Sequence, residues 1–358
     1  MDVLTRRLRS TRLTGPRFAV PEDVVAWFGA VQAQDYQPAK WTLGERVAGG
    51  TDAAVDAAFA DGRILRTHVL RPTWHFVTPA DIHWLLEATA HRVLRLNATM
   101  VRQTGLDDVV LGRARELLTA ALTGGRQRTR ADLAGVLAAG GIEATGQRLA
   151  YVLMDAELRG VICSGALAGR QHTYALLAER VPAPVRLGRE EAIAELAVRY
   201  FTSHGPATAK DLQWWSSLTL GEIAAGLELA APRLERTEHA GLTWWSGPGE
   251  VAEPEPSPAV HLLQGYDEYV SYGETKALLV PPASPLAMGE RRLPFNHLVI
   301  LDGTVGGFWK RTINRRSVLI EAALLTPFDA AATAALERAA AAHGQFLGVP
   351  ATVTTAVL

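Results

Sequence analysis

Residues 65–78 read Leu-Arg-Thr-His-Val-Leu-Arg-Pro-Thr-Trp-His-Phe-Val-Thr. Apolar and polar side chains alternate from Leu65 to Leu70 and again from Trp74 to Thr78, a pattern typical of strands that bury one face. Arg71-Pro72-Thr73 lies between the two runs. We therefore expect a β-hairpin with these three residues at its tip.

Three helical segments come before this hairpin. Pro21 suits the first position of a helix, where its missing N–H is not needed, and apolar residues recur at helical spacing after it. Shorter helices are expected over residues 41–47 and 53–61. Three helices followed by a hairpin is the order of a winged-helix unit.

The same order recurs twice along the chain. Thr129-Arg-Ala-Asp132 and Thr208-Ala-Lys-Asp211 place one helix-capping signal at equivalent positions in the second and third occurrences. We therefore predict three tandem winged-helix units, over residues 1–105, 106–185 and 186–250.

The chain changes character after the third unit. Four prolines between residues 247 and 258 mark a linker, and Asp302-Gly303 is a strong hairpin signal. An alanine-rich helix is expected over Asp329 to His343. Short apolar runs predict strands over residues 260–263, 276–280, 297–301, 305–310 and 317–324. Residues 251–358 are thus predicted to hold the linker and a small β-barrel with a terminal helix, and the fold class is α+β.

Composition places the chain among globular proteins, since 48% of its 358 residues are hydrophobic and 20% are charged. No apolar run approaches the roughly 18 residues of a membrane span, and the arginine-rich N-terminus lacks the apolar core of a signal peptide. We expect a cytoplasmic protein without membrane contact. The single cysteine, Cys163, excludes an internal disulfide framework and a cysteine-cluster metal site.

Charge is unevenly distributed along the chain. Residues 1–130 hold 18 Lys and Arg against 13 Asp and Glu, whereas residues 131–358 hold 18 against 24. Only four of the 36 basic residues are lysines, and arginine forms bidentate contacts with phosphate. The basic N-terminal third is interpreted either as a surface for a partner or as a solvated face.

Residues 31–35 read Val-Gln-Ala-Gln-Asp, where the helix that begins at Pro21 runs out. A glutamine amide is neither a strong acid nor a strong base, but it can hold a water or a polar ligand. Residues two apart do not face each other on a helix, so Gln32 and Gln34 can share a site only if the helix ends or distorts there. The alternative is two solvated side chains at a helix end.

The hairpin carries four polar side chains: His68, Arg71, Thr73 and His75. Arg and His at its tip suit contact with a DNA backbone or groove. The alternative is a hairpin packed on its own core, which we favour for its aromatic residues Trp74 and Phe76. No third ligand at useful spacing accompanies the two histidines, so no metal site is predicted. No motif for a phosphate-bearing cofactor occurs in a strand-helix context.

Two further motifs are set apart by their composition. The pairs Trp214-Trp215 and Trp244-Trp245 are interpreted as core of the third unit. Tyr266-Asp-Glu-Tyr269 follows the linker, and it is interpreted as a transition from strand to loop with solvated acids. The functional alternative places this loop near a channel mouth.

In combination, the repeated units and four motifs resemble the AlkZ-like branch of the helix-turn-helix DNA glycosylases over nearly the whole chain. The motifs are residues 31–35, the segment Arg66 to Val77 with its Arg-Pro-Thr-Trp-His, residues 266–269 and Gly307-Phe-Trp-Lys310. The resemblance implies three winged-helix units and a β-barrel, in a C-shaped molecule around a DNA channel. It also implies removal of N7-alkylated guanines and, in some members, unhooking of interstrand crosslinks. The family's Gln-apolar-Gln motif falls on Gln32, Ala33 and Gln34.

This activity suits glutamines. An N7-alkylguanine is cationic and leaves as a neutral base, so the enzyme chiefly has to position a water at C1′ and stabilise an oxocarbenium-like sugar. We expect Gln32 and Gln34 to orient that water and Asp35 to add negative potential as an auxiliary group. The DNA-contacting candidates are those of the hairpin together with Lys40 and Arg148.

The predicted protein is therefore a monofunctional DNA glycosylase without metal or organic cofactor. Its partner is double-stranded DNA carrying alkylated purines, on which it acts as a monomer at the nucleoid. The alternative is a non-catalytic winged-helix regulator. Its candidate recognition helix, residues 145–159, offers few side chains to bases: Gln147, Arg148 and Arg159.

Overall fold

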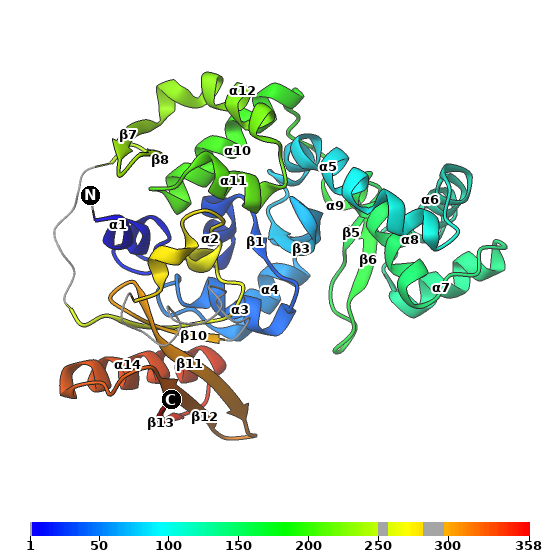
Figure 1. The fold of residues 1–358 in the computed structure, drawn as a ribbon. Coiled ribbons are helices and arrows are strands. Elements are labelled where there is room, and N and C mark those ends of the chain that lie inside the picture. The colour runs from blue at the N-terminus through cyan, green and yellow to red at the C-terminus, as the bar shows by residue number, and fades with distance from the viewer. Residues whose placement is uncertain (1, 250–256, 282–296) are drawn as a thin grey trace.

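The computed structural model describes residues 2–249, 257–281 and 297–358 of this mixed α+β protein (Figure 1). Most of the predicted linker, residues 250–256, lies outside the described residues. The part of the chain that precedes residue 105 forms these elements: α1 (Val3–Ser10), α2 (Pro21–Phe28), β1 (Val31–Gln32), α3 (Tyr36–Gly44), α4 (Asp52–Ala60), β2 (Leu65–Val69), β3 (Arg71–Val77) and α5 (Ile82–Gln103).

The predicted hairpin belongs to a three-stranded antiparallel sheet with the order β1-β3-β2. Its tip is Leu70, with φ of 63°, so the prediction that Arg71-Pro72-Thr73 forms the turn is wrong. These residues begin β3 instead. The register of β2 shifts between His68 and Val69, and such an irregularity tolerates the proline N that cannot donate to the ladder.

The order of three helices and a hairpin recurs as predicted. In the second occurrence the strands form a sheet of order β4-β6-β5, and in the third they form a two-stranded hairpin. Both predicted Thr-x-x-Asp signals are capping boxes, at Thr129 and Thr208. The elements are α6 (Asp108–Leu122), β4 (Arg128–Thr129), α7 (Arg130–Ala139), α8 (Gly146–Leu158), β5 (Ile162–Ser164), β6 (Thr173–Leu176), α9 (Leu177–Arg180), α10 (Arg189–His204), α11 (Ala209–Ser216), α12 (Leu220–Ala230), η1 (Ala231–Arg233), β7 (Glu235–His239) and β8 (Leu242–Ser246).

The C-terminal part forms an open sheet instead of the predicted β-barrel. Within residues 257–281 and 297–358 the sheet has five strands in the order β13-β12-β11-β10-β9, and the edge strands β13 and β9 do not pair with each other. The prediction of a strand over residues 276–280 is also wrong, because this segment is a 3-10 helix. The elements are β9 (Val260–Leu263), η2 (Glu268–Val270), η3 (Lys276–Leu279), β10 (His297–Leu301), β11 (Thr304–Ile313), β12 (Val318–Leu324), α14 (Ala330–Leu347) and β13 (Ala351–Val357).

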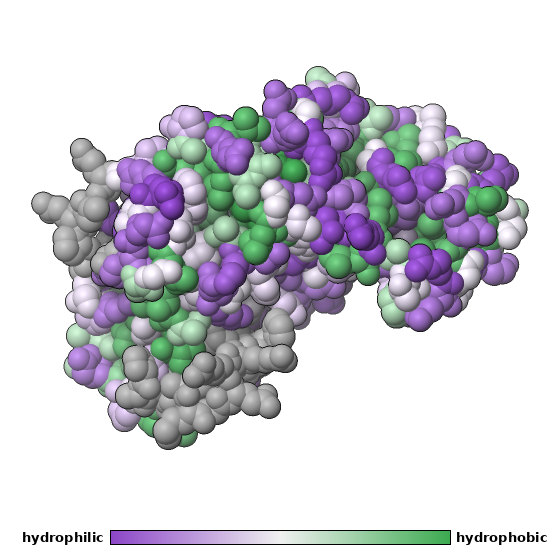
Figure 2. All heavy atoms as spheres, turned by 45° about the horizontal axis from the view of Figure 1, so that its top comes forward, coloured by the Kyte–Doolittle hydropathy of each residue, from purple (hydrophilic) through white to green (hydrophobic). Residues whose placement is uncertain are grey.

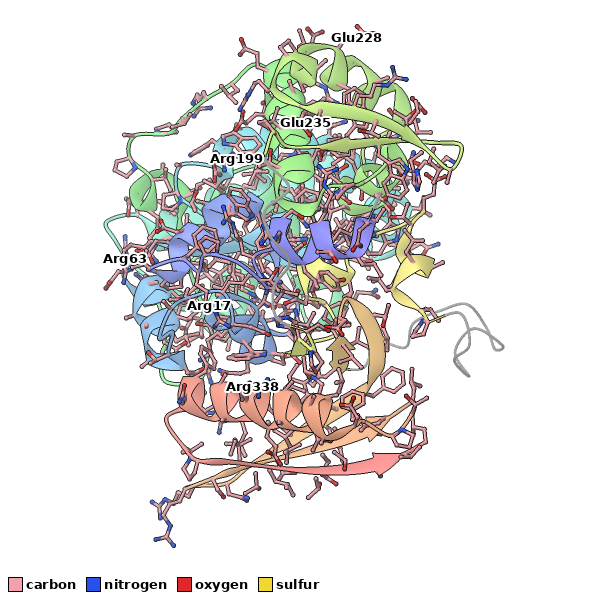
Figure 3. All side chains as sticks on the ribbon, turned by 90° about the vertical axis from the view of Figure 1, so that its left-hand side faces the viewer. Arg17, Arg63, Arg199, Glu228, Glu235 and Arg338 are labelled. Atoms are coloured by element: carbon pink, nitrogen blue, oxygen red, sulfur yellow. The ribbon has the colours of Figure 1, made fainter. Side chains whose placement is uncertain are left out.

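Helix α14 explains why the sheet stays open. It connects β12 to β13, which pair in parallel, and it lies between the sheet and the rest of the molecule (Figure 3). One apolar core joins this helix to the N-terminal elements, through residues such as Trp41, Phe76, Leu336 and Phe346. A helix layered on one face buries that face without closure.

The second segment stands apart. Its apolar core is built mainly from α6, α7, α8 and the adjoining strands, with Val101 of α5 packed against it, while Met154 and Leu158 of α8 join the core of the main body. Figure 2 shows this lobe projecting from the main body, with a hollowed outline between the two. The sheet β1-β3-β2 lies where the main body meets the lobe, since β2 contacts both α8 and β5. No helix within the described residues is long and apolar enough to cross a membrane.

Candidate active site at the first hairpin

The chain leaves helix α2 before it reaches either glutamine of the motif. Helix α2 ends at Phe28, and its cap Gly29 has φ of 78°, a conformation that favours glycine. Val31–Gln32 then form β1, and the pairing continues as Ala33 N donates to Trp74 O at 2.7 Å. Extended backbone places residues i and i+2 on one side. Gln34 lies at a bend two residues after Gln32, so helical geometry no longer separates the two side chains.

Gln32 is nearly buried, with 7% of its surface exposed. Its Oε1 accepts a hydrogen bond from Arg71 Nη2 at 2.7 Å. A guanidinium has donors only, so the amide atom that faces it must be the carbonyl oxygen. That oxygen keeps a second lone pair for another donor, such as a water.

Gln34 is exposed, and its carbonyl oxygen is held in a similar way. Trp74 N donates to Gln34 Oε1 at 3.2 Å, so a side-chain oxygen continues the ladder where β1 has ended. Arg66 supports the same segment, because its Nε donates to Ala33 O at 3.0 Å and its guanidinium lies 4.4 Å from the centroid of the Trp74 ring. Each glutamine thus presents an oriented amide.

Strand β3 adds three polar side chains at alternate positions. Arg71, Thr73 and His75 occur two residues apart, and His75 lies directly opposite Gln32 in the register. Directly opposite residues on paired strands share one face. Each of the three holds a buried polar atom without a partner in the described part of the chain: Arg71 Nη1, Thr73 Oγ1 and His75 Nε2. The face beside Gln32 therefore has unused hydrogen-bonding capacity.

His75 is an electrically neutral acceptor on this face. The side chain is fully buried, and its Nδ1–H donates to Thr73 O at 2.9 Å. Burial, reinforced by the positive charge of Arg71, places the pKa of His75 well below its ordinary value. With the proton on Nδ1, Nε2 carries a free lone pair.

Glu268 supports the backbone of Gln32 from the other end of the chain. Its Oε1 accepts from Gln32 N at 2.8 Å, and its Oε2 accepts from His204 Nε2 at 3.0 Å and Trp215 Nε1 at 2.9 Å. Burial alone would raise the pKa of this carboxyl, but the hydrogen bond and charge of His204 and the two N–H donors outweigh it, so the pKa is lowered. Glu268 is a buried carboxylate that fixes β1.

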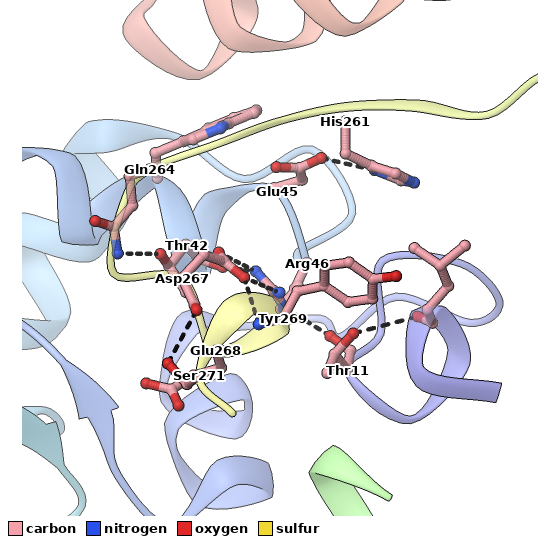
Figure 4. Close-up of polar contacts among 12 residues, drawn as sticks. Thr11, Thr42, Glu45, Arg46, His261, Gln264, Asp267, Glu268, Tyr269 and Ser271 are labelled. Carbon is pink, nitrogen blue, oxygen red and sulfur yellow. Dashed lines mark hydrogen bonds and ion pairs between the residues drawn. The ribbon is translucent and has the colours of Figure 1, made fainter. Parts of the chain in front are cut away.

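The interpretation of residues 266–269 as a loop with solvated acids is wrong. Asp267 and Glu268 are 1% and 0% exposed. Asp267 forms a bidentate pair with Arg46, at 2.7 Å and 3.0 Å, as Figure 4 shows. Four hydrogen bonds occupy the Arg46 guanidinium in total, because Thr11 O and Thr42 O also accept from it. The motif therefore ties the C-terminal part to the first helices.

Three of the predicted DNA-contacting residues are engaged inside the protein. The Lys40 side chain is 1% exposed, and its ammonium contacts Asp52 and Asp56, each at 2.8–3.0 Å. His68 is buried between Glu157 and the ring of Trp74. Because both side chains are buried and paired with acids, neither residue is placed to bind a phosphate. Arg148 Nη1 donates to the carbonyl of Thr104, which ties α8 to the end of α5.

Two other predicted residues lie at different depths. His75 is fully buried, so it cannot contact a DNA backbone at the surface as predicted. Asp35 is exposed at the start of α3, and its charge acts on Arg311 and His297 of the C-terminal sheet. Its side chain makes no hydrogen bond that would hold it beside the glutamines among the described residues.

Sequence reasoning missed Glu268, His204 and Trp214 as neighbours of the site. The prediction that Trp214 and Trp215 are both core is correct for Trp215, which is fully buried. It is wrong for Trp214, which is 44% exposed. The one available signal was an unexplained acid in the 266–269 motif. No group of three or more His, Cys, Asp and Glu able to hold a metal ion occurs in the described part of the chain.

Comparison with known proteins identifies the class. The chain is a DNA glycosylase, an enzyme that hydrolyses N-glycosyl bonds of DNA. It belongs to the AlkZ-like DNA glycosylase family, whose model matches residues 25–346. The alternative of a non-catalytic regulator is therefore set aside.

Two comparisons with individual proteins agree with this family. The chain is 26% identical over 329 residues to the "Interstrand DNA cross-link repair glycosylase" of Streptomyces sahachiroi, with 86% of this chain and 84% of the relative covered. It has the same fold as the solved structure of Streptomyces sahachiroi DNA glycosylase AlkZ, with a TM-score of 0.81, 23% identity and 98% of each chain covered.

Proposed function

We propose that this enzyme removes N7-alkylated guanine from double-stranded DNA, with Gln32 and Gln34 positioning the attacking water. The observation that carries the proposal is that both amide oxygens are held by donors, from Arg71 and from the backbone of Trp74, in the short segment between helices α2 and α3. A water that donates both hydrogens to these oxygens directs its lone pairs away from them. The lone pairs then face the sugar.

The proposed reaction needs no strong acid. The bond from C1′ to the base nitrogen breaks, and its electron pair neutralises the positive charge of the alkylated base. The water oxygen then bonds to C1′, and its proton passes to solvent, because burial and the charge of Arg71 keep the pKa of His75 too low for that imidazole to hold it. The buried Glu268 contributes by holding the Gln32 backbone in place.

The proposed DNA partner fits the architecture. We propose that the three helix-and-hairpin segments are winged-helix units, and that duplex DNA enters the hollow between the main body and the lobe as a complex with one protein monomer. Arg71 and Thr73 would contact the backbone near the lesion, since each has an unused polar atom. Asp35, exposed nearby in sequence, stays a predicted auxiliary. The name of the Streptomyces sahachiroi relative extends the proposal to interstrand crosslinks.

Substitution of both glutamines tests the proposal. We expect Q32A/Q34A to abolish release of 7-methylguanine from a methylated duplex in single-turnover assays, while binding to an abasic-site analogue is retained. Gln37→Ala, an exposed glutamine on α3, is the matched control and should excise at the normal rate. Excision by the double variant at the wild-type rate would overturn the assignment.

A further inference from the structure

Two cations lie over one exposed indole ring beside the proposed catalytic glutamines. The Arg71 Cζ is 4.7 Å from the centroid of the Trp214 ring, and Lys276 Nζ is 5.9 Å from the same centroid. The three residues come from β3, α11 and η3, so three distant parts of the chain converge here. Both distances fall within the range of cation–π attraction.

A buried carboxylate holds this arrangement together. Asp211 of α11 is fully buried, and its Oδ1 accepts from the backbone N–H groups of Gly273 and Thr275, each at 3.0 Å. Its Oδ2 accepts from Thr275 Oγ1 at 2.7 Å. The loop that leads into Lys276 is therefore clamped to the helix that carries Trp214.

Gly273 sets the closeness of this approach. A Cβ at residue 273 would lie 2.5 Å from Trp214 Cβ, a separation that real Cβ atoms do not tolerate. Only glycine lets the loop reach the indole without displacing it. The position of Lys276 relative to Trp214 is thus defined by backbone contacts as well as by its own side chain.

Both cations have unused capacity for an anion. Lys276 makes no ion pair with a carboxylate among residues 2–249, 257–281 and 297–358, whereas Lys210 on α11 is paired with Glu274 at 2.6 Å. Arg71 uses Nη2 on Gln32, and its Nη1 is unpaired in that same part of the chain. Burial, with the charge of Arg71, lowers the pKa of Lys276. An anion between the two would relieve this repulsion.

We propose that Arg71, Lys276 and Trp214 form a subsite for one backbone phosphate of the lesion strand. The indole supports both cations and the phosphate accepts from both. Because Arg71 also donates to Gln32 Oε1, an occupied subsite fixes the guanidinium and, through it, the glutamine carbonyl. DNA binding would thereby complete the catalytic geometry. This inference rests on the proposed role of Gln32, but the phosphate contact can be measured without it.

The salt dependence of binding tests the contact. A duplex with one tetrahydrofuran abasic-site analogue is the probe, and Kd is measured from 50 to 200 mM salt. We expect Lys276→Gln to weaken binding and to reduce the slope of log Kd against log salt by about 1, the loss of one phosphate contact. The control Lys210→Gln should leave the slope unchanged. An unaltered slope for K276Q would overturn the proposal.

Methylphosphonate scanning locates the phosphate. A single neutral methylphosphonate is placed at each position flanking the analogue. At the contacted position, the methylphosphonate should lower the affinity of the wild type. It should hardly change the affinity of K276Q, which already lacks the contact. Losses that are additive at every position would contradict a shared contact. Trp214→Phe should retain the slope and Trp214→Leu should reduce it, which separates ring support from simple packing.

The outcomes distinguish this inference from the proposed function. If Q32A/Q34A abolishes excision and K276Q keeps the wild-type salt slope, the phosphate subsite alone is refuted. If Q32A/Q34A excises normally and K276Q reduces the salt slope, the catalytic role of the glutamines is refuted and the phosphate subsite is supported. The link between them predicts that K276Q lowers the single-turnover rate at saturating DNA, whereas a rate equal to the wild type would contradict that link.

Discussion

The backbone N–H of Gln32 donates to Glu268 Oε1 at 2.8 Å, across 236 residues of the chain. This bond joins the extended segment of the glutamine motif to a carboxylate of the C-terminal part. The other carboxylate oxygen accepts from His204 and Trp215 of the third helical segment. The position of the proposed catalytic amide therefore depends on three parts of the molecule at once.

Glu268→Gln should disturb this position. The two carboxylate oxygens meet only donors, so either orientation of a glutamine amide turns an NH2 group toward another donor. We expect the free energy of unfolding to fall by about 1–3 kcal/mol, and single-turnover excision to fall at saturating DNA. Urea unfolding and base release measure the two effects. Glu228→Gln, at an exposed site on α12 (Figure 3), should change neither. Wild-type stability and rate in E268Q would refute the assigned role.

The buried pair of Arg46 and Asp267 should contribute strongly to stability. Asp267→Ala leaves a buried guanidinium without its partner, and we expect a loss of about 3–5 kcal/mol in urea unfolding. Arg46→Lys should fail to restore the wild type, because an ammonium cannot reproduce the bidentate pair. Arg63→Ala, which removes an exposed pair with Glu22, should lose less than about 1 kcal/mol. Equal losses at the buried and exposed pairs would contradict this account.

Stability should fall in mild acid because of His343. Burial, with the charges of Arg311 and His297, lowers its pKa to about 3. Below its ordinary value of 6.5 the unfolded chain therefore takes up a proton that the folded protein does not, so stability decreases as the pH falls. One such group contributes a loss of about 2 kcal/mol between pH 7 and pH 5. His343→Gln, which retains an acceptor for Arg311, should lack this component. Parallel stability curves for the two proteins would disprove it.

Gly29 should be needed to end helix α2 ahead of the glutamines. Its φ of 78° is unfavourable for a residue with a Cβ, so Gly29→Ala should lower stability by about 1–2 kcal/mol. Gly135→Ala, inside helix α7 with open space around it, should instead raise stability by about 0.5–1 kcal/mol. Thermal unfolding of both variants measures the contrast. A neutral G29A variant would show that another feature ends the helix.

Local signals in the sequence predicted most elements correctly, since helix starts and tight turns depend on neighbouring residues. Pro21 begins α2, the two Thr-x-x-Asp signals are capping boxes, and Asp302-Gly303 forms the turn between β10 and β11. The β-barrel was wrong because closure depends on whether edge strands meet, which no local pattern records. The hairpin tip was misplaced because Pro72 and Thr73 are extra residues of β3, between the partners of His68 and Val69, and the turn lies at Leu70.

The sequence by itself determined that Gln32 and Gln34 had to leave helical geometry to share a site, since the helical repeat turns residues two apart in different directions. Only the tertiary structure decided which charged groups surround them. Lys40 is buried against acids of α4 and His68 against Glu157 of α8, and Glu268 and Lys276 reach the site from more than 200 residues away. Burial and hydrogen-bond partners are properties of the packed chain, because non-local contacts decide them.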